Sequence, residues 1–287
     1  MDYNFNMDSA TPCSVIGDYW FKLDSEFQPF GPLVNGGKLR QCLSYVTTML
    51  AKREYEHIVS ASSIYSPQSA IVAAVAQHFG IPCKVYFGGT SDKRLTVMLN
   101  PKIASYFDAD FEIVSTGRHS VIFQKAAQFA KENNGLLIDY GMNALENVKD
   151  FFDTNANQVR NLPGDLDNLI IPCGSGITSA GILYGIYKYG IRIRTIYLVG
   201  VAPHRLDKIK KLLFKLQIPF PNNITYIHLF GESNFQYEKK MLCSYCGIIL
   251  HPNYEAKVGN WLFNHSKIDL ESEKTCFWIV GKEASLT

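Results

Sequence analysis

A lysine that directly follows two glycines is the first feature of this chain whose residue types and order could do chemistry. Gly36 and Gly37 carry no Cβ, so the backbone can turn tightly there and approach a ligand closely. Apolar residues then recur at helical spacing, which places Lys38 in the first turn of a helix, beside backbone N–H groups without helical partners. These apolar residues are Leu39, Cys42, Leu43, Val46 and Leu50. A lysine in that position can bind a phosphate, act as an amine nucleophile, or be a solvated surface residue.

A second glycine-rich turn, Gly174-Ser175-Gly176-Ile177-Thr178, lies between the apolar run Leu169–Cys173 and a helical pattern. Successive backbone N–H groups at a helix N-terminus form a cradle for an anion, and the hydroxyls of Ser175 and Thr178 add donors. The turn has no Gly-Lys-Ser/Thr ending, and Ser179 stands where a complete G-x-G-x-x-G motif has its last glycine. It is therefore not a nucleoside-triphosphate P-loop, but a phosphate site and a merely structural turn both remain open.

A serine-rich loop over residues 62–69 also precedes a helical pattern. Its hydroxyl and N–H groups could bind a carboxylate through the same helix-terminus electrostatics. The alternative is that Ser66 or Ser69 only caps the helix that follows.

The segment His251–Lys257 opens a late helix and places Tyr254 next to Glu255. A phenol beside a carboxylate can supply an acid/base group and a fixed negative charge. Glu255 alone is better explained as a favourable charge at a helix start than as a catalytic group.

These four segments, in this order and over most of the chain, resemble the pyridoxal-phosphate enzymes of the tryptophan-synthase-β fold type (fold type II). Within that fold type the chain is most similar to the 1-aminocyclopropane-1-carboxylate deaminase and D-cysteine desulfhydrase group. The resemblance implies pyridoxal 5'-phosphate as cofactor and an amino acid as substrate. It also implies reaction through an external aldimine, by deamination or α,β-elimination, to a 2-oxo acid and ammonia. A homodimer is expected.

By the same resemblance, each motif residue has an expected role. Lys38 is the Schiff-base lysine and the proton-transfer base, Ser66 and Tyr254 are catalytic, and Glu255 contacts the pyridine nitrogen. A carboxylate there favours the protonated ring, which is the stronger electron sink. The cofactor phosphate is held by Gly174, Ser175, Gly176, Ile177 and Thr178. The substrate-facing residues are Ser63, Tyr65, Ser66 and Gln68.

Some positions depart from the family pattern. Pro67 stands where the family has an asparagine that contacts the cofactor's phenolic oxygen, and Ser62 and Ser63 replace glycines. Ile177 replaces a glycine of the phosphate loop. These departures keep two alternatives open. One is an enzyme for a larger or macromolecule-linked amino compound, such as an amino acid attached to a nucleic acid. The other is a non-catalytic relative that serves as a binding or structural protein.

Strand and helix patterns alternate along the whole chain. Repeated β-then-α order predicts an α/β fold with two lobes, each a mostly parallel sheet covered by helices, with the cofactor in the cleft between them. We expect residues 45–150 to form the small domain, and residues 1–44 plus 151–287 the large cofactor-binding domain. The polar stretch Asn155–Asp167 is expected to connect the lobes.

Composition narrows the class of protein. Of the 287 residues, 47% are hydrophobic and 19% charged, which indicates a globular protein, and the formal net charge of +2 gives no reason to expect nucleic-acid or membrane binding. No apolar run is long enough to span a bilayer. No signal peptide is apparent, and seven scattered cysteines favour a reducing compartment, so a cytoplasmic location is expected. The seven histidines show no metal-binding spacing, so no metal is expected.

Overall fold

The computed structural model describes residues 7, 9–142, 148–231, 235, 239–265 and 270–284. The chain forms two compact units. Unit 1 consists of Met1–Phe27 and Val148–Glu283, and unit 2 of Gln28–Asn147 and Ala284–Thr287. Residues 28–44 thus group with unit 2, although the sequence analysis assigned them to the large domain. The reason is that helix α1 (Gly37–Leu50) packs against α2 (Gln68–His78).

Unit 1 contains a six-stranded sheet in the order β1-β2-β12-β7-β8-β9. Its strands are β1 (Cys13–Ile16), β2 (Tyr19–Leu23), β7 (Asn168–Cys173), β8 (Thr195–Gly200), β9 (Ile224–His228) and β12 (Thr275–Ile279). All neighbours run parallel except β1 and β2, which form an antiparallel hairpin at one edge. The mostly parallel sheet that the sequence predicts is confirmed, whereas the sequence analysis did not identify β1.

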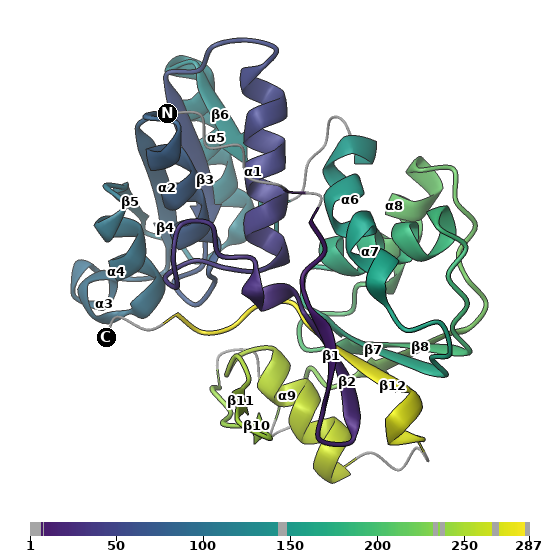
Figure 1. Cartoon of the computed structure of the whole chain (residues 1–287). Helices are drawn as coiled ribbons and strands as arrows, with labels where there is room; N and C mark the ends of the chain where they lie inside the picture. Colours follow the sequence, from purple (N-terminus) through teal and green to yellow (C-terminus); the bar gives the residue numbers. More distant parts are fainter. Residues whose placement is uncertain are drawn as a thin grey trace. The chain divides into compact units, whose positions relative to one another are not determined.

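Helices cover both faces of this sheet, as a parallel sheet requires. In Figure 1, α7 (Ile177–Lys188) and α8 (Leu206–Lys215) lie on one side of β7 and β8, and α9 (Glu255–Asn260) lies on the other. The α9 side is sealed by an apolar cluster that includes Phe21, Tyr197, Val258 and Phe277. A small hairpin of β10 (Ser244–Tyr245) and β11 (Ile248–Ile249) packs at this cluster through Tyr245 and Ile248.

The segment expected to connect the lobes belongs to unit 1 instead. Helix α6 (Val148–Ala156) continues into a short 3-10 helix, Asn157–Asn161, and both pack against α7. A Cβ on Gly185 of α7 would lie 2.5 Å from the carbonyl oxygen of Ala156, so only glycine permits this close approach. The sequence pattern predicts a helix around residues 145–152, of which residues 145–147 lie outside the described residues.

Unit 2 contains a four-stranded, fully parallel sheet in the order β5-β4-β3-β6. Its strands are β3 (His57–Ser62), β4 (Cys83–Gly88), β5 (Asp110–Val114) and β6 (Gly135–Ile138). Helix α5 (His119–Glu132) packs on the sheet through a cluster that includes Val59, Tyr86 and Ala126. Helix α2 also packs on β3 and β4, and its residues Gln68–Ala76 are all buried. Two helices that the sequence analysis did not identify, α3 (Asp92–Val97) and α4 (Leu99–Tyr106), complete the unit.

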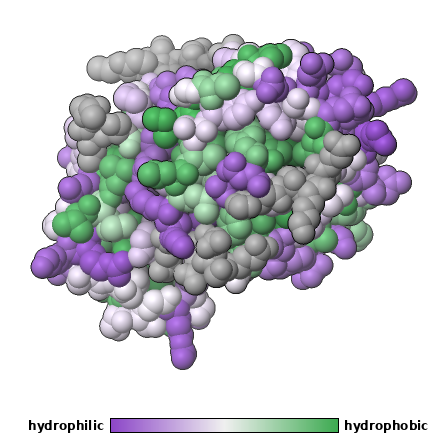
Figure 2. Space-filling model, turned by 90° about the horizontal axis from the view of Figure 1, so that it is seen from below, coloured by the Kyte–Doolittle hydropathy of each residue, from purple (hydrophilic) through white to green (hydrophobic). Residues whose placement is uncertain are grey.

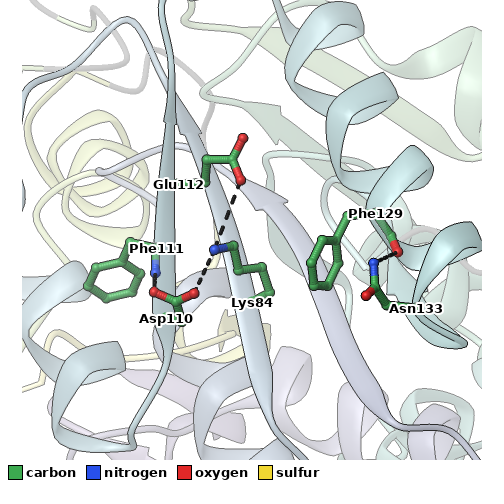
Figure 3. Close-up of polar contacts among 6 residues, drawn as sticks. All are labelled: Lys84, Asp110, Phe111, Glu112, Phe129 and Asn133. Carbon is green, nitrogen blue, oxygen red and sulfur yellow. Dashed lines mark hydrogen bonds and ion pairs between the residues drawn. The ribbon is translucent and has the colours of Figure 1, made fainter.

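The edge strand β5 is fixed by charge as well as by backbone pairing. Lys84 of β4 lies 2.5 Å from a carboxylate oxygen of Asp110 and 3.9 Å from one of Glu112 (Figure 3). Its ammonium group also lies over the ring of Phe129 of α5. The charges on this edge therefore have partners on neighbouring elements of the same unit.

The surface is mixed in character. Hydrophilic and hydrophobic side chains are interspersed over the face seen in Figure 2. Among the described residues, no helix is both long and apolar enough to cross a bilayer. Within the same part of the chain, no three His, Cys, Asp or Glu side chains are grouped so that they could hold a metal ion.

Candidate functional site

Lys38 lies in the first turn of α1, as the sequence predicts. Gly36 precedes the helix with φ of 88°, a conformation that L side chains rarely adopt. Gly37, Leu39 and Arg40 are buried, and Lys38 is half-buried. A cation at the positive end of a helix dipole is electrostatically unfavourable. The predicted role of Lys38 as the Schiff-base lysine stays a prediction.

The serine-rich loop of unit 2 is closed by its own hydrogen bonds. The N–H of Ser66 donates to the carbonyl oxygen of Ser63 at 3.0 Å, and the N–H of Tyr65 donates to the Ser63 hydroxyl at 3.3 Å. The Ser66 hydroxyl in turn accepts the N–H of Gln68 at 3.3 Å. The Tyr65 hydroxyl accepts a hydrogen bond of 2.6 Å from Arg94. The loop therefore holds Ser63, Tyr65 and Ser66 in fixed positions.

Gln68 points into unit 2 rather than out of it. Its side-chain nitrogen donates to the Ser60 hydroxyl and to the carbonyl oxygen of Asp139, both at 3.0 Å. Its side-chain oxygen accepts the N–H of Gly141 at 2.7 Å. The residue is only 1% exposed. Gln68 thus anchors the loop to β3 and to the end of β6, and its predicted contact with substrate stays a prediction.

Two buried polar side chains of unit 2 are relevant to the site: Gln41, which the sequence analysis missed, and Ser69, which it considered only as part of the serine-rich loop or as a helix cap. Both side-chain atoms of the Gln41 amide and the hydroxyl of Ser69 have no hydrogen-bond partner among the described residues. Gln41 lies three residues after Lys38 in α1, and Ser69 lies in the first turn of α2. Buried polar groups are nearly always satisfied, so these atoms point to a polar ligand or water. Helical propensity alone gives no signal for them.

The glycine turn of unit 1 connects β7 to α7, as predicted, and a side chain at Gly176 would be strained. Gly176 has φ of 81°, and a Cβ there would lie 3.1 Å from Ile209 and 3.3 Å from the Cβ of Arg205. A Cβ on Gly174 would lie 3.4 Å from the ring of Tyr254. The structure therefore brings Tyr254 next to the glycine turn, although the two lie 80 residues apart in the sequence.

Glu255, at the start of α9, holds the chain that follows β12. One of its carboxylate oxygens accepts the N–H groups of both Val280 and Gly281, each at 3.1 Å. The residue is only 2% exposed. Two residues later, burial lowers the pKa of Lys257 to about 8. The backbone partners of Glu255 were not foreseen, and its predicted contact with the pyridine nitrogen stays a prediction.

The predicted site residues thus form two groups. Lys38, Ser63, Tyr65, Ser66 and Gln68 belong to unit 2, with the last four in or next to one loop. The residues from Gly174 to Thr178, with Tyr254 and Glu255, belong to unit 1.

Comparison with known proteins identifies the type of enzyme. Residues 11–225 match the model of the family described as "Pyridoxal-phosphate dependent enzyme". The chain is 25% identical, over an alignment of 349 residues, to the "O-seryl-dTMP PLP-dependent decarboxylase" of Salmonella phage ViI. That alignment covers 95% of this chain and 81% of the relative.

Solved structures of low sequence identity share the fold. A 1-aminocyclopropane-1-carboxylate (ACC) deaminase homologue superposes with a TM-score of 0.75 at 16% identity, over 95% of this chain and 89% of its own. Threonine deaminase isoform 2 from Solanum lycopersicum gives a TM-score of 0.65 at 11% identity, over 96% and 84%. The maize serine racemase gives 0.61 at 14% identity, over 96% and 89%.

The residues present fit pyridoxal 5'-phosphate. The turn from Gly174 to Thr178 is a backbone cradle at a helix N-terminus, which is the arrangement that binds phosphate. The unpartnered amide of Gln41, near Lys38, is the kind of buried group that a polar ligand would satisfy.

Proposed function

Because this chain belongs to the family of pyridoxal-phosphate-dependent enzymes, we propose that it removes the α-carboxylate from an amino acid that is attached to a nucleotide. The observation that carries this proposal is the sequence likeness, over nearly the whole chain, to an O-seryl-dTMP decarboxylase. The departures at Pro67 and Ser62 support it, because they alter the loop that faces the amino acid in the deaminase group. They favour a substrate other than a free amino acid.

In this proposal the site residues keep the roles that the sequence predicts for them. The turn from Gly174 to Thr178 would hold the phosphate of pyridoxal 5'-phosphate, Lys38 would carry the cofactor, and Glu255 would contact its ring nitrogen. When bound, the cofactor withdraws electrons from the α-carbon of the attached amino acid. The chain's own residues then orient the substrate and move protons.

The proposed reaction breaks the bond between the α-carbon and the carboxylate. Carbon dioxide leaves, the electron pair stays at the α-carbon, and a proton takes the vacated position. Lys38 Nζ delivers this proton once the substrate has displaced it. The fixed loop, through Ser63 and Ser66, holds the serine part of the substrate. The link between serine oxygen and nucleotide stays intact.

The test uses purified protein with its cofactor and O-seryl-dTMP. We expect mass spectrometry to detect a nucleotide that has lost one carbon dioxide and kept its amine, with no reaction by Lys38→Ala. If O-seryl-dTMP stays unchanged while D-cysteine or L-threonine is consumed, the proposal is wrong.

Deamination or α,β-elimination of an amino acid is the second candidate. The observation that favours it is Tyr254, which matches the catalytic tyrosine of the deaminase group and lies against Gly174. Elimination from the same substrate would break the link to the nucleotide instead. Free nucleotide, 2-oxo acid and ammonia would then appear in place of the amine, so one assay separates the two reactions.

A non-catalytic relative is the third candidate. It would be favoured by a colourless protein in which borohydride fixes no cofactor to Lys38. The homodimer and the cytoplasmic location stay predictions.

A further inference from the structure

Three successive strands of unit 1 end at the same edge of the sheet, next to the glycine turn. Strands β7, β8 and β9 are parallel neighbours, so their carboxyl ends lie side by side. The glycine turn follows β7, His204 and Arg205 follow β8, and Phe230 follows β9. In open α/β sheets this edge is where ligands bind.

Four aromatic rings gather at this edge. The centroid of the His204 ring lies 4.5 Å from that of Tyr226 and 5.4 Å from that of His228. Phe230 extends the row, at 6.1 Å from His228 with an angle of 32° between the rings. His204 and His228 are exposed, and Tyr226 and Phe230 are half-buried.

The alternation of side chains puts these rings on the α8 side of the sheet. Tyr226 and His228 are two residues apart in β9, so they share a face. Ile227 and Leu229, between and beyond them, pack instead into the apolar cluster on the α9 side. The rings of Tyr226 and His228 therefore stand apart from the main core of unit 1.

Tyr226 is the fixed base of this ring row. Its hydroxyl accepts the backbone N–H of Arg205 at 3.3 Å, and a Cβ on Gly200 would lie 2.5 Å from the same oxygen. Burial raises the pKa of Tyr226 to about 12, so the phenol is neutral at physiological pH. A neutral ring in a fixed position is a suitable surface for stacking.

Positive charge lies between the rings and the glycine turn. Arg205 packs against Gly176, and its Nε is buried with no hydrogen-bond partner among the described residues. Lys208 lies in the first turn of α8. Its positive charge, like that of Arg205, interacts electrostatically with the thiol of Cys173 at the end of β7. Rings flanked by cations are the combination that binds nucleotides, through base stacking and phosphate contacts.

We propose that the ring row of His204, Tyr226, His228 and Phe230 binds the base of a pyrimidine nucleotide, and that Arg205 and Lys208 face its phosphate. The proposal rests on the proposed function, because it names the part of unit 1 that would hold the nucleotide of the substrate. A free nucleotide and a nucleotide within a DNA strand share this chemistry.

Binding without turnover tests the proposal. The cofactor-loaded protein is titrated with dTMP by calorimetry, and with fluorescein-labelled oligothymidylate by anisotropy. We expect His204→Ala/His228→Ala to weaken binding about tenfold or more, because each stacked base depends on its ring. His204→Phe should keep most of the affinity, since a ring remains. Tighter binding of the oligonucleotide than of dTMP would identify a DNA strand as the source of the nucleotide.

Phe214→Ala is the matched control. Phe214 is an aromatic residue of the same helix α8, is 81% exposed and does not belong to the ring row. Its loss should leave both affinities unchanged. Equal binding by wild type and by the double histidine variant, or no binding of either probe by wild type, overturns the proposal, even if O-seryl-dTMP is decarboxylated. Ring-dependent binding without release of carbon dioxide would count against the proposed reaction alone.

Discussion

The glycine turn of unit 1 and the serine-rich loop of unit 2 occupy equivalent places, because each follows a strand that has parallel neighbours on both sides. Each follows a buried strand, β7 or β3, and each leads into a buried helix, α7 or α2. Their backbones differ. In the serine-rich loop, the N–H groups of Tyr65, Ser66 and Gln68 all donate to oxygens of Ser63 or Ser66. The glycine turn instead contains a left-handed residue, Gly176, at which a Cβ would lie only 3.1 Å from Ile209.

This difference indicates that the serine-rich loop and the glycine turn have different roles. A loop that has used its own N–H groups can present side chains in fixed positions, but it has few backbone donors left for an anion. A turn of glycines at a helix N-terminus offers the backbone itself. We therefore expect changes in unit 2 to affect mainly turnover and loop stability, and changes in the glycine turn to affect mainly cofactor affinity.

The largest effect is expected from Lys38→Ala in unit 2. Without the amine, proton transfer at the α-carbon loses its donor, and turnover should fall by about three to four orders of magnitude. Rapid-mixing kinetics with added cofactor measures this. The phosphate cradle is untouched, so the variant should still bind pyridoxal phosphate reversibly. Lys52→Ala, at an exposed position after the same helix, should behave as wild type.

The next effect concerns the stability of the serine-rich loop. Gln68→Ala removes a buried amide that forms hydrogen bonds with Ser60, Asp139 and Gly141. These three groups then lose a buried hydrogen-bond partner. We expect the free energy of unfolding to fall by about 2–3 kcal/mol. Urea denaturation measures this. Gln128→Ala, an exposed glutamine that bonds only across one turn of α5, should cost less than about 0.5 kcal/mol. Equal losses for the two variants would contradict the anchoring role of Gln68.

A smaller effect is expected from Gly176→Ala in the glycine turn. The left-handed backbone and the contacts with Ile209 and Arg205 should distort the cradle and weaken cofactor binding about tenfold. Fluorescence titration with pyridoxal phosphate measures this. The matched control is Gly190→Ala, because Gly190 is also left-handed, with φ of 64°, but has open space around it. Gly190→Ala should lower the free energy of unfolding by a similar amount and leave the affinity for pyridoxal phosphate unchanged.

The smallest effect is a pH dependence of stability from Lys257 in unit 1. Burial lowers the pKa of Lys257 in the folded state to about 8, below its ordinary value of 10.5. Between these values the unfolded state binds more protons, so stability should rise with pH, by about 1 kcal/mol per pH unit. Below the folded-state pKa both states carry the proton, and this contribution becomes constant. Chemical denaturation of Lys257→Met across pH 7 to 10 should lack this rise. If the stability of Lys257→Met rises with pH by the same amount, the pH dependence belongs to another titratable group.

The periodic parts of the chain were predictable from sequence. Strands that end in turn residues and helices with one apolar stripe repeat in β-then-α order, and this order fixes a parallel sheet. α3 was missed because Asp92–Val97 is polar and buries only Leu95. The stretch beginning at Asn155 looked like a connection because its residues are polar, although Asn155 is fully buried against α7 at Gly181.

The candidate functional site was predictable only where short sequence motifs identify its residues. The two glycine motifs lie at helix starts, as expected. No local pattern shows that Gln68 turns inward, that Glu255 holds Val280 and Gly281, or that His204 meets Tyr226. Each of these contacts depends on which strands become neighbours, which is settled by packing over long sequence separations.

The place of β12 in its sheet has a consequence for synthesis. This strand lies between β2 and β7, so unit 1 pairs its early strand β2 with a segment made more than 250 residues later. On the ribosome, β2 and β7 cannot be joined through their shared neighbour until Thr275–Ile279 has emerged. Unit 2 draws its strands from one continuous stretch, 57–138, and can fold first. During translation the nascent chain therefore carries a folded unit 2 and an unfinished unit 1, whose exposed β7 edge is the segment that a chaperone would protect.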